Sequence, residues 1–277
     1  VTTSVKALKI ELSKVKGNAL LIGFFKDKLN LNIELKKLDK DFRNIISSYI
    51  KNNSFKGEMG EIKNIYIDKN IKNIFLVGLG EEEKYNFDIL SSTIADVSKR
   101  LRGNKIEDFS IFLNSFNNRK FKDEELVEKI ALSSLIGLYQ FTEYKTKDND
   151  KIRHIKQITI ITNLNKNLDN EIRYAYVVAD AVNKTRDLVN TPPNIATPEY
   201  VASYAKELAK KSGLKCTIFD EKQIVKMKMG CFLGVAQGST NKPRLVVLEY
   251  YGTDKKQKPI AIVGKGVTFD SGGLNLK

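Results

Sequence analysis

The chain has 277 residues, of which 42% are hydrophobic and 29% charged, and its formal net charge at pH 7 is +14. This length suffices for two modest domains, and the composition is typical of a globular protein. No apolar run approaches the roughly 20 residues that span a bilayer, so we expect no membrane-spanning segment and no membrane partner.

The N-terminus and the cysteines indicate a cytoplasmic protein. Five charged residues between Lys6 and Lys16 interrupt the first apolar cluster, which therefore differs from a secretory signal peptide. The chain has two cysteines, Cys216 and Cys231, too few for a disulfide framework at this size. We expect both to be reduced thiols.

The positive charge is concentrated in the second half of the chain. Residues 1–150 carry a net charge of +4, and residues 151–277 carry +10. A basic balance is one signature of nucleic-acid binding, so DNA is a candidate partner. An acidic continuation of the polypeptide would explain the excess equally well. Both explanations stay open, because net charge alone is a weak signal.

The first half alternates segments of strand-like and helix-like spacing. Apolar runs bounded by turn residues predict strands, and apolar residues three and four apart predict helices. Strands alternating with helices favour an α/β sandwich. The predicted strands span residues 5–12, 19–25, 62–67, 71–77 and 109–113, and the predicted helices span 39–51, 86–101 and 123–139.

The second half begins after a polar, charged stretch at residues 142–150, the best candidate for a linker. A predicted helix at 169–189 ends where Pro192 and Pro193 force extended backbone. Thr197 and Pro198 then provide the cap and first position of a new helix that ends near Gly213. The predicted strands of this half span residues 155–162, 215–219, 245–250 and 260–263.

Few common catalytic motifs occur in this sequence. His154 is the only histidine, which excludes a His-rich zinc site, and nothing places a nucleophile beside it. We expect it to be exposed to solvent. The stretch Gly264-Lys265-Gly266 lacks the spacing and the hydroxyl residue of a phosphate-binding loop.

The strongest candidate site follows the apolar run at residues 260–263, which we expect to form a buried parallel strand. The run leads into a glycine-rich turn that carries Lys265, Asp270 and Lys277. Open α/β sheets place their ligands at such strand ends. Lys265 and Asp270 could form a plain salt bridge. They could instead bind a divalent ion, with Lys265 desolvated to a neutral amine and Asp270 as a carboxylate ligand.

Four ordered stretches of sequence carry a resemblance to a known family. They are residues 139–145 (YQFTEYK), 186–194 (RDLVNTPPN), 229–252 (beginning MGCFLGVAQGS) and 263–277 (VGKGVTFDSGGLNLK). Together they resemble the leucyl aminopeptidases, also called the cytosol aminopeptidase family. The resemblance covers about residues 139–277, and residues 1–138 are only compatible with it.

This resemblance implies an α/β fold with three parts. Residues 1–147 would form a three-layer, macro-like N-terminal domain, and residues 148–190 a linking strand and helix. Residues 191–277 would be the first part of an α/β metallopeptidase domain, left incomplete. The implied protein is a cytoplasmic homo-hexamer.

The resemblance also implies the chemistry. The family removes N-terminal residues from peptides with two divalent ions, Mn²⁺ or Zn²⁺. Carried over to this sequence, Lys265 is a ligand of one metal and Asp270 a carboxylate shared between both. Lys277 is the catalytic lysine that stabilises the substrate carbonyl oxygen as it becomes negative.

The sequence differs from the family pattern because it contains only the first part of the family's catalytic residues. The remaining metal ligands and the active-site arginine of the family have no counterpart in it, so we expect this polypeptide to be inactive by itself. The initial Val1 suggests either a fragment of a longer protein or an alternative start codon. The alternative is a DNA-binding or regulatory N-terminal module.

Overall fold

The computed structural model describes residues 3–52, 54–67, 69–147, 152–254 and 257–270. The chain divides into two compact units, Val1–Lys184 and Thr185–Lys277, which are described separately. We call them the N-terminal unit and the C-terminal unit.

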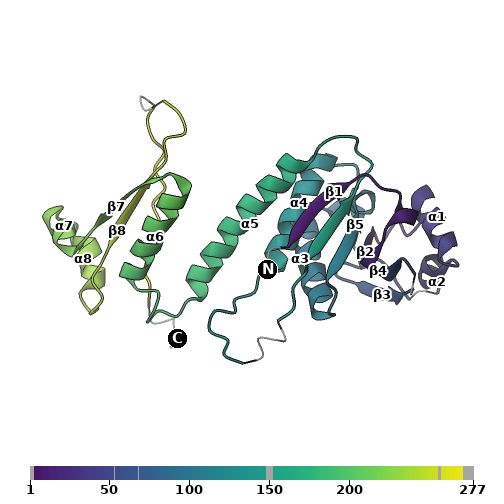
Figure 1. Cartoon of the computed structure of the whole chain (residues 1–277), viewed down its shortest axis with the longest axis horizontal. Helices are drawn as coiled ribbons and strands as arrows, with labels where there is room; N and C mark the ends of the chain where they lie inside the picture. Colours follow the sequence, from purple (N-terminus) through teal and green to yellow (C-terminus); the bar gives the residue numbers. More distant parts are fainter. Residues whose placement is uncertain (1–2, 53, 68, 148–151, 255–256, 271–277) are drawn as a thin grey trace. The chain divides into compact units, whose positions relative to one another are not determined.

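The N-terminal unit is built on a six-stranded sheet (Figure 1). The strand order is β1-β6-β5-β2-β4-β3, and every neighbouring pair is parallel except the antiparallel hairpin of β3 and β4. The strands are β1 (Ser4–Leu8), β2 (Gly17–Phe24), β3 (Ile62–Tyr66), β4 (Ile71–Gly78), β5 (Asp108–Phe112) and β6 (Gln157–Ile161).

Strand β2 shows why this sheet is covered on both faces. Successive side chains of a strand point to opposite faces, so a continuous apolar run needs partners on both sides. Ala19 and Leu21 belong to one buried cluster, whereas Leu20 and Ile22 belong to the other. All four are almost completely buried. The run therefore specifies a central strand between two layers of helices.

The helices form the two outer layers of the N-terminal unit. One cluster joins the sheet to α3 (Phe87–Gly103), α4 (Asp123–Gly137) and the first part of α5 (Asp169–Asn190). The other joins it to α1 (Ile33–Asp41) and α2 (Ile45–Lys51). This arrangement confirms the predicted three-layer α/β fold (Figure 1). Three short 3₁₀ helices complete it: η1 (Leu12–Lys14), η2 (Glu82–Lys84) and η3 (Leu113–Phe116).

The single helix predicted at residues 39–51 is wrong. Arg43 and Asn44 have positive φ angles of 60° and 59°, which end α1 and start α2 in a new direction. The Asp39 carboxylate accepts hydrogen bonds from the backbone N–H groups of Ile46 (2.8 Å) and Ser47 (3.3 Å), capping α2 across the turn. Apolar periodicity does not reveal such a break, because the residues on both sides of it still face the sheet.

The C-terminal unit contains a smaller set of elements. Helix α6 (Pro198–Ser212) begins at a Thr197 cap and ends at Gly213, whose φ is 68°, as predicted. Strands β7 (Lys215–Phe219) and β8 (Leu245–Glu249) form an antiparallel pair. Two short helices between them, α7 (Glu221–Lys226) and α8 (Gly230–Ala236), escaped the sequence analysis. Throughout the described part of the chain, no helix has the length and apolarity needed to cross a bilayer.

The buried strand predicted at residues 260–263 is wrong for this structure. Residues 257–270 form no helix or strand, and Ile260, Ile262 and Val263 are 93–95% exposed. An apolar run becomes a strand only where a neighbouring strand accepts its backbone hydrogen bonds and another layer covers its side chains. In the described structure β7 and β8 pair only with each other.

Candidate functional site

The residues predicted to bind metal lie on the extended segment of the C-terminal unit. Lys265 and Asp270 are both exposed and occupy no regular element. Lys277, the predicted catalytic lysine, lies outside the described residues. The structure therefore describes two of the three predicted site residues and holds them on the same short segment.

A complete metal centre is not assembled by the residues described. Lys265 could offer one amine nitrogen and Asp270 one carboxylate, whereas zinc requires four ligands and Mn²⁺ more. Within the described ranges, no three His, Cys, Asp or Glu residues come together as a metal-binding group. The donor types suit Zn²⁺ or Mn²⁺, but their number does not.

The stretch that leads into this unit is a well-defined turn between two helices. The Thr191 N–H and hydroxyl both donate to the Asp187 carbonyl, at 2.9 and 2.7 Å, and so extend the end of α5. The N–H groups of Ile195 and Ala196 then both donate to the Pro192 carbonyl, at 2.9 and 2.8 Å. Proline fixes the backbone here, and the hydrogen bonds set the point at which α6 begins.

The β7–β8 pair carries one of the ion pairs of the C-terminal unit. Lys215 and Glu249 are opposite each other in register, with Nζ and Oε2 2.6 Å apart. The Tyr251 hydroxyl lies 2.6 Å from the other oxygen of the same carboxylate. The Lys215 ammonium and the Tyr251 hydroxyl hold the pKa of Glu249 below its ordinary value. The Glu249 carboxylate is therefore held in an ion pair across the two strands, which supports their register.

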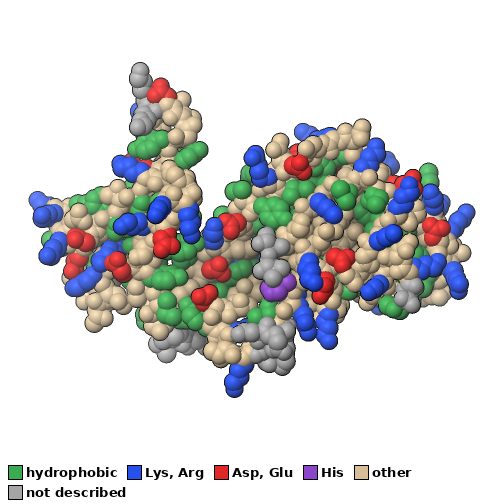
Figure 2. Space-filling view, viewed as in Figure 1, with side chains coloured by type: hydrophobic (Ala, Val, Ile, Leu, Met, Phe, Trp, Pro, Cys, Tyr) green, Lys and Arg blue, Asp and Glu red, His purple; other side chains and the backbone are tan. Residues whose placement is uncertain are grey.

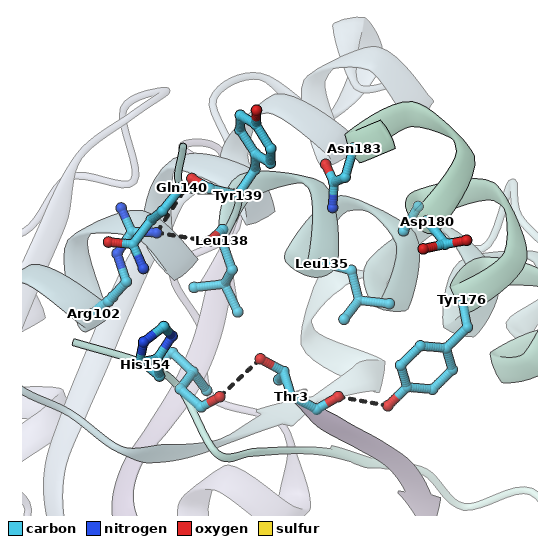
Figure 3. Close-up of a pocket in the computed structure, with 12 residues that line it drawn as sticks. Thr3, Arg102, Leu135, Leu138, Tyr139, Gln140, His154, Tyr176, Asp180 and Asn183 are labelled. Carbon is cyan, nitrogen blue, oxygen red and sulfur yellow. Dashed lines mark hydrogen bonds between the residues drawn. The ribbon is translucent and has the colours of Figure 1, made fainter. Parts of the chain in front are cut away.

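The N-terminal unit contains a pocket of about 230 Å³ between the end of α4, the start of β1 and α5 (Figure 3). Its wall combines apolar side chains, among them Leu135 and Leu138, with polar ones contributed by five separate segments. The polar residues that line it are Thr3, Arg102, Tyr139, Gln140, His154, Tyr176, Asp180 and Asn183.

Two polar side chains of this pocket serve the fold. The Tyr176 hydroxyl donates a hydrogen bond to the Thr3 carbonyl and accepts one from the Val5 N–H, both at 2.7 Å. These two bonds provide partners for backbone groups at the start of β1. Arg102 donates to the Leu138 carbonyl at 2.8 Å at the C-terminal end of α4, and burial lowers the pKa of its guanidinium. Figure 3 shows both groups aimed at backbone atoms.

His154 is exposed, as expected from the sequence, and lines the same pocket. Nothing in the sequence indicated this pocket, because its lining is brought together from five separate segments. The arrangement does not pair a nucleophile with a base, so the pocket is not a candidate catalytic centre.

On the face of the molecule shown in Figure 2, the positive charge does not gather into one stripe. On the face shown in Figure 2, Lys and Arg side chains are interspersed with Asp and Glu on each unit. Many of these charges form pairs, such as Lys26–Glu58 at 2.9 Å. DNA binding therefore stays a prediction that rests on net charge.

Comparison with protein families identifies the chain. The N-terminal domain of the cytosol aminopeptidase family matches residues 21–148, and the catalytic domain of the same family matches residues 183–277. The chain belongs to the cytosol aminopeptidase family. The resemblance seen in the sequence is thereby confirmed, and it extends into the first 138 residues, which by themselves were only compatible with it.

Curated relatives agree with this assignment. A probable cytosol aminopeptidase of Aquifex aeolicus is 34% identical over 274 residues, covering 99% of this chain and 54% of the relative. Another from Sulfurihydrogenibium sp. is 37% identical over 272 residues, covering 96% of this chain and 53% of the relative. The chain thus spans about half the length of the cytosol aminopeptidases that it matches.

Solved structures support the same fold. A mutant tomato leucine aminopeptidase superposes with a TM-score of 0.87 at 24% identity, over 99% of this chain and 56% of the tomato chain. The bottromycin maturation enzyme BotP, solved in complex with Mn, superposes with a TM-score of 0.68 at 18% identity. The superposition covers 86% of this chain and 46% of the BotP chain. The likeness to tomato leucine aminopeptidase spans the N-terminal domain and the start of the catalytic domain.

Within this cytosol aminopeptidase family member, the predicted site residues all fall inside the range matched by the catalytic domain. The roles of Lys265, Asp270 and Lys277 stay predictions. Likewise, the two compact units meet at residues 184 and 185, but the three-part division predicted from the sequence stays a prediction.

Proposed function

We propose that this chain supplies the N-terminal domain and the first part of the catalytic domain of a metal-dependent aminopeptidase. The observation that carries the proposal is the ordered match of both domains of one peptidase family to residues 21–148 and 183–277. The substrates would be peptides with a free N-terminus, and the protein would act in the cytosol as a hexamer.

The proposed metal site draws on the extended segment of the C-terminal unit. Lys265 would ligate one divalent ion through its neutral amine, and Asp270 would ligate two ions through its carboxylate. The ions, Mn²⁺ or Zn²⁺, would supply Lewis acidity and an activated water. The presence of Mn in the BotP structure supports the choice of metal. Lys277 would stabilise negative charge on the substrate carbonyl oxygen.

The 277-residue chain by itself is expected to be inactive. Two donors do not hold two divalent ions, because each ion requires about four to six ligands. Metal analysis of the purified chain after dialysis against Zn²⁺ or Mn²⁺ should find fewer than two tightly bound ions. Two stoichiometric ions, or turnover of a leucine amide substrate, would contradict this expectation.

The reaction is tested with a chimera that joins this chain to the half of the Sulfurihydrogenibium relative that it does not match. We expect Mn²⁺-dependent release of leucine from a peptide with a free N-terminus, and no release from its N-acetylated form. Replacing Asp270→Asn or Lys265→Met should lower kcat by at least about a thousandfold, because each would remove a metal ligand.

A matched control keeps the test specific. Asp254→Asn removes an exposed carboxylate of the same unit that has no proposed role, and it should leave kcat within about twofold of the parent chimera. A chimera that folds and binds metal but cleaves no peptide would refute the proposed reaction. Full activity of the Asp270→Asn variant would refute the proposed site.

A further inference from the structure

The pocket shown in Figure 3 lies entirely within the N-terminal unit. The residues that line it fall between Thr3 and Asn183, whereas the predicted metal ligands Lys265 and Asp270 belong to the C-terminal unit. The pocket volume of about 230 Å³ corresponds to roughly eight water molecules at their share of liquid volume. The pocket therefore uses none of the predicted metal-site residues and has room for a small organic ligand.

Two of the polar groups in the lining are already used by the fold. The Thr3 hydroxyl donates a hydrogen bond to the Ile155 carbonyl at 2.8 Å, and the Tyr176 hydroxyl donates to the Thr3 carbonyl at 2.7 Å. A hydroxyl has a single donor, so neither group has a hydrogen left to offer to a ligand. These two side chains shape the wall, and recognition of a charged ligand depends on other groups.

One end of the pocket holds two side chains with unused donors. Arg102 donates through Nη1 to the carbonyl oxygens of Leu138 (2.8 Å) and Tyr139 (3.5 Å), and no residue described accepts a hydrogen bond from its Nε or Nη2. The His154 imidazole likewise makes no hydrogen bond within the described ranges, and Figure 3 shows it at the same end as Arg102. A guanidinium with free N–H groups is a preferred partner of carboxylates. This end therefore suits a carboxylate.

The opposite end of the pocket is acidic. One oxygen of Asp180 pairs with Lys184 at 2.5 Å, one turn further along α5, and its other oxygen accepts no hydrogen bond from any residue described. Figure 3 shows Asp180 across the pocket from Arg102 and His154. A carboxylate has about four acceptor positions, so Asp180 can bind an ammonium group in addition to Lys184.

The surface between these two ends is apolar. Leu135 and Leu138 are half-buried, and Figure 3 shows both between the basic and the acidic end. Ile155 and Ala179, which also line the pocket, are only 1% and 3% exposed. An apolar group placed here would remove exposed surface of the two leucines from water, which is favourable.

These three features together select one class of ligand. We propose that the pocket binds a short peptide with two free termini, with its C-terminal carboxylate at Arg102 and His154 and its N-terminal ammonium at Asp180. A single α-amino acid carries both charges on one carbon atom and cannot place them on either side of the leucines. An extended dipeptide separates them by about 7 Å and places apolar side chains in between.

The proposal rests on the side chains of the pocket and not on the proposed reaction. Binding is therefore measured with the 277-residue chain in EDTA, so that no metal is bound and no peptide is cleaved. A chain that binds peptides but never cleaves them, even in the chimera, would support this site and count against the reaction. If the reaction is also correct, the ligand belongs to the same chemical class as its substrates and products.

The first test is a titration with the dipeptide Ala-Leu, followed by the methyl NMR signals of leucines. The signals of Leu135 and Leu138 should shift and saturate, and the signal of Leu126, which is fully buried in the core, should not. We expect a dissociation constant of about 0.1–1 mM, because a ligand with few atoms has a limited total binding energy.

Modified ligands test each end of the pocket separately. N-acetyl-Ala-Leu lacks the ammonium group, Ala-Leu amide lacks the carboxylate, and free leucine lacks the separation between the two charges. Each should bind at least about tenfold more weakly than Ala-Leu, because each leaves one charge-assisted hydrogen bond unmade.

A matched pair of variants connects the ammonium group to Asp180. Asp180→Asn should weaken Ala-Leu at least about tenfold and leave the affinity for N-acetyl-Ala-Leu unchanged. Asp96→Asn is the control, because Asp96 forms a similar exposed pair with Arg100 on α3, at 2.9 Å, and lies outside the pocket. Both aspartates are exposed, so neither variant should alter the circular dichroism of the chain.

Three outcomes would overturn the proposal. The first is the absence of saturable shifts at Leu135 and Leu138 with Ala-Leu at up to about 10 mM, tenfold above the weakest expected dissociation constant. The second is free leucine binding as tightly as Ala-Leu. The third is an equal effect of Asp180→Asn and Asp96→Asn on the affinity for Ala-Leu.

Discussion

The two units of this chain differ most in what surrounds their strands. In the N-terminal unit, a six-stranded sheet lies between two helical layers and buries large side chains such as Phe75, Phe109 and Ile22. In the C-terminal unit, a two-stranded sheet rests beside α6, and the buried residues are mainly alanines and Ile224. Hydrophobic stabilisation scales with the apolar area removed from water, so it is concentrated in the N-terminal unit.

Two similar apolar runs show what this difference means. Residues 19–22 (ALLI) and 260–263 (IAIV) are both runs of four apolar residues. The first run is at most 1% exposed between β4 and β5, whereas the three large residues of the second are more than 90% exposed. The fate of an apolar run therefore depends on whether its neighbours are present.

The largest expected effect comes from removing core volume in the N-terminal unit. Leu20→Ala should lower the free energy of unfolding of that unit by roughly 3 kcal/mol, because Leu20 is fully buried on β2 and leaves a cavity. Val247→Ala in β8 should cost less than about 1 kcal/mol, because that side chain already touches water. Urea unfolding followed by circular dichroism measures both, and equal costs would contradict the comparison.

Replacing a glycine by alanine should change stability in opposite directions in the two units. A Cβ atom at Gly137 would lie 2.5 Å from the Ala95 carbonyl oxygen and 2.6 Å from its Cα, where α4 crosses α3. Gly137→Ala should therefore destabilise the N-terminal unit by about 1–3 kcal/mol. Gly234 in α8 has no atom within 4 Å of such a Cβ, so Gly234→Ala should stabilise its helix by up to about 1 kcal/mol.

Thermal unfolding of the two glycine variants provides the measurement. The variant at Gly137 should melt at a lower temperature than the wild-type chain, and the variant at Gly234 should not. A destabilised Gly234→Ala variant would show that α8 packs more tightly than the structure indicates.

The smallest expected effect concerns two exposed ion pairs, one in each unit. Lys156 lies 2.5 Å from Glu107, and Lys215 lies 2.6 Å from Glu249; in each pair the lysine holds the pKa of the glutamate below its ordinary value. Each carboxylate thus stabilises its unit above the unfolded-state pKa of about 4.3, and this contribution is lost as the pH falls through the folded-state pKa.

Carboxyl NMR titrations test these two pairs. Lys215→Met should raise the pKa of Glu249, and Lys156→Met should raise the pKa of Glu107. Each replacement should leave the pKa of the glutamate in the other unit unchanged. An unchanged pKa of Glu249 in Lys215→Met would mean that the Tyr251 hydroxyl alone lowers it.

Local patterns in the sequence were sufficient to predict much of the fold. Continuous apolar runs located the strands of the six-stranded sheet, and the cap at Thr197 marked a helix start because its oxygen accepts a backbone N–H bond. Periodicity failed at Arg43 and Asn44, where the Asp39 cap starts a second helix. It also failed at α7 and α8, which are too short for a clear period.

The candidate site was likewise predictable only in part. The stretch at residues 263–277, which contains Lys265, Asp270 and Lys277, indicated the family together with three other ordered stretches, because such motifs are read from residue order alone. Their assembly into a centre requires ligands from other segments, and spacing along one segment does not supply them. The pocket between Arg102 and Tyr176 was not predictable, since its lining comes from five segments that only packing brings together.

The sequence by itself determined the strands of both sheets, most of the long helices and the family, because these depend on short-range periodicity, capping and motif order. Only the tertiary structure decided which apolar runs are buried, since burial requires neighbouring strands and a covering layer. Residues 19–22 have both in the N-terminal unit, and residues 260–263 have neither in the structure described.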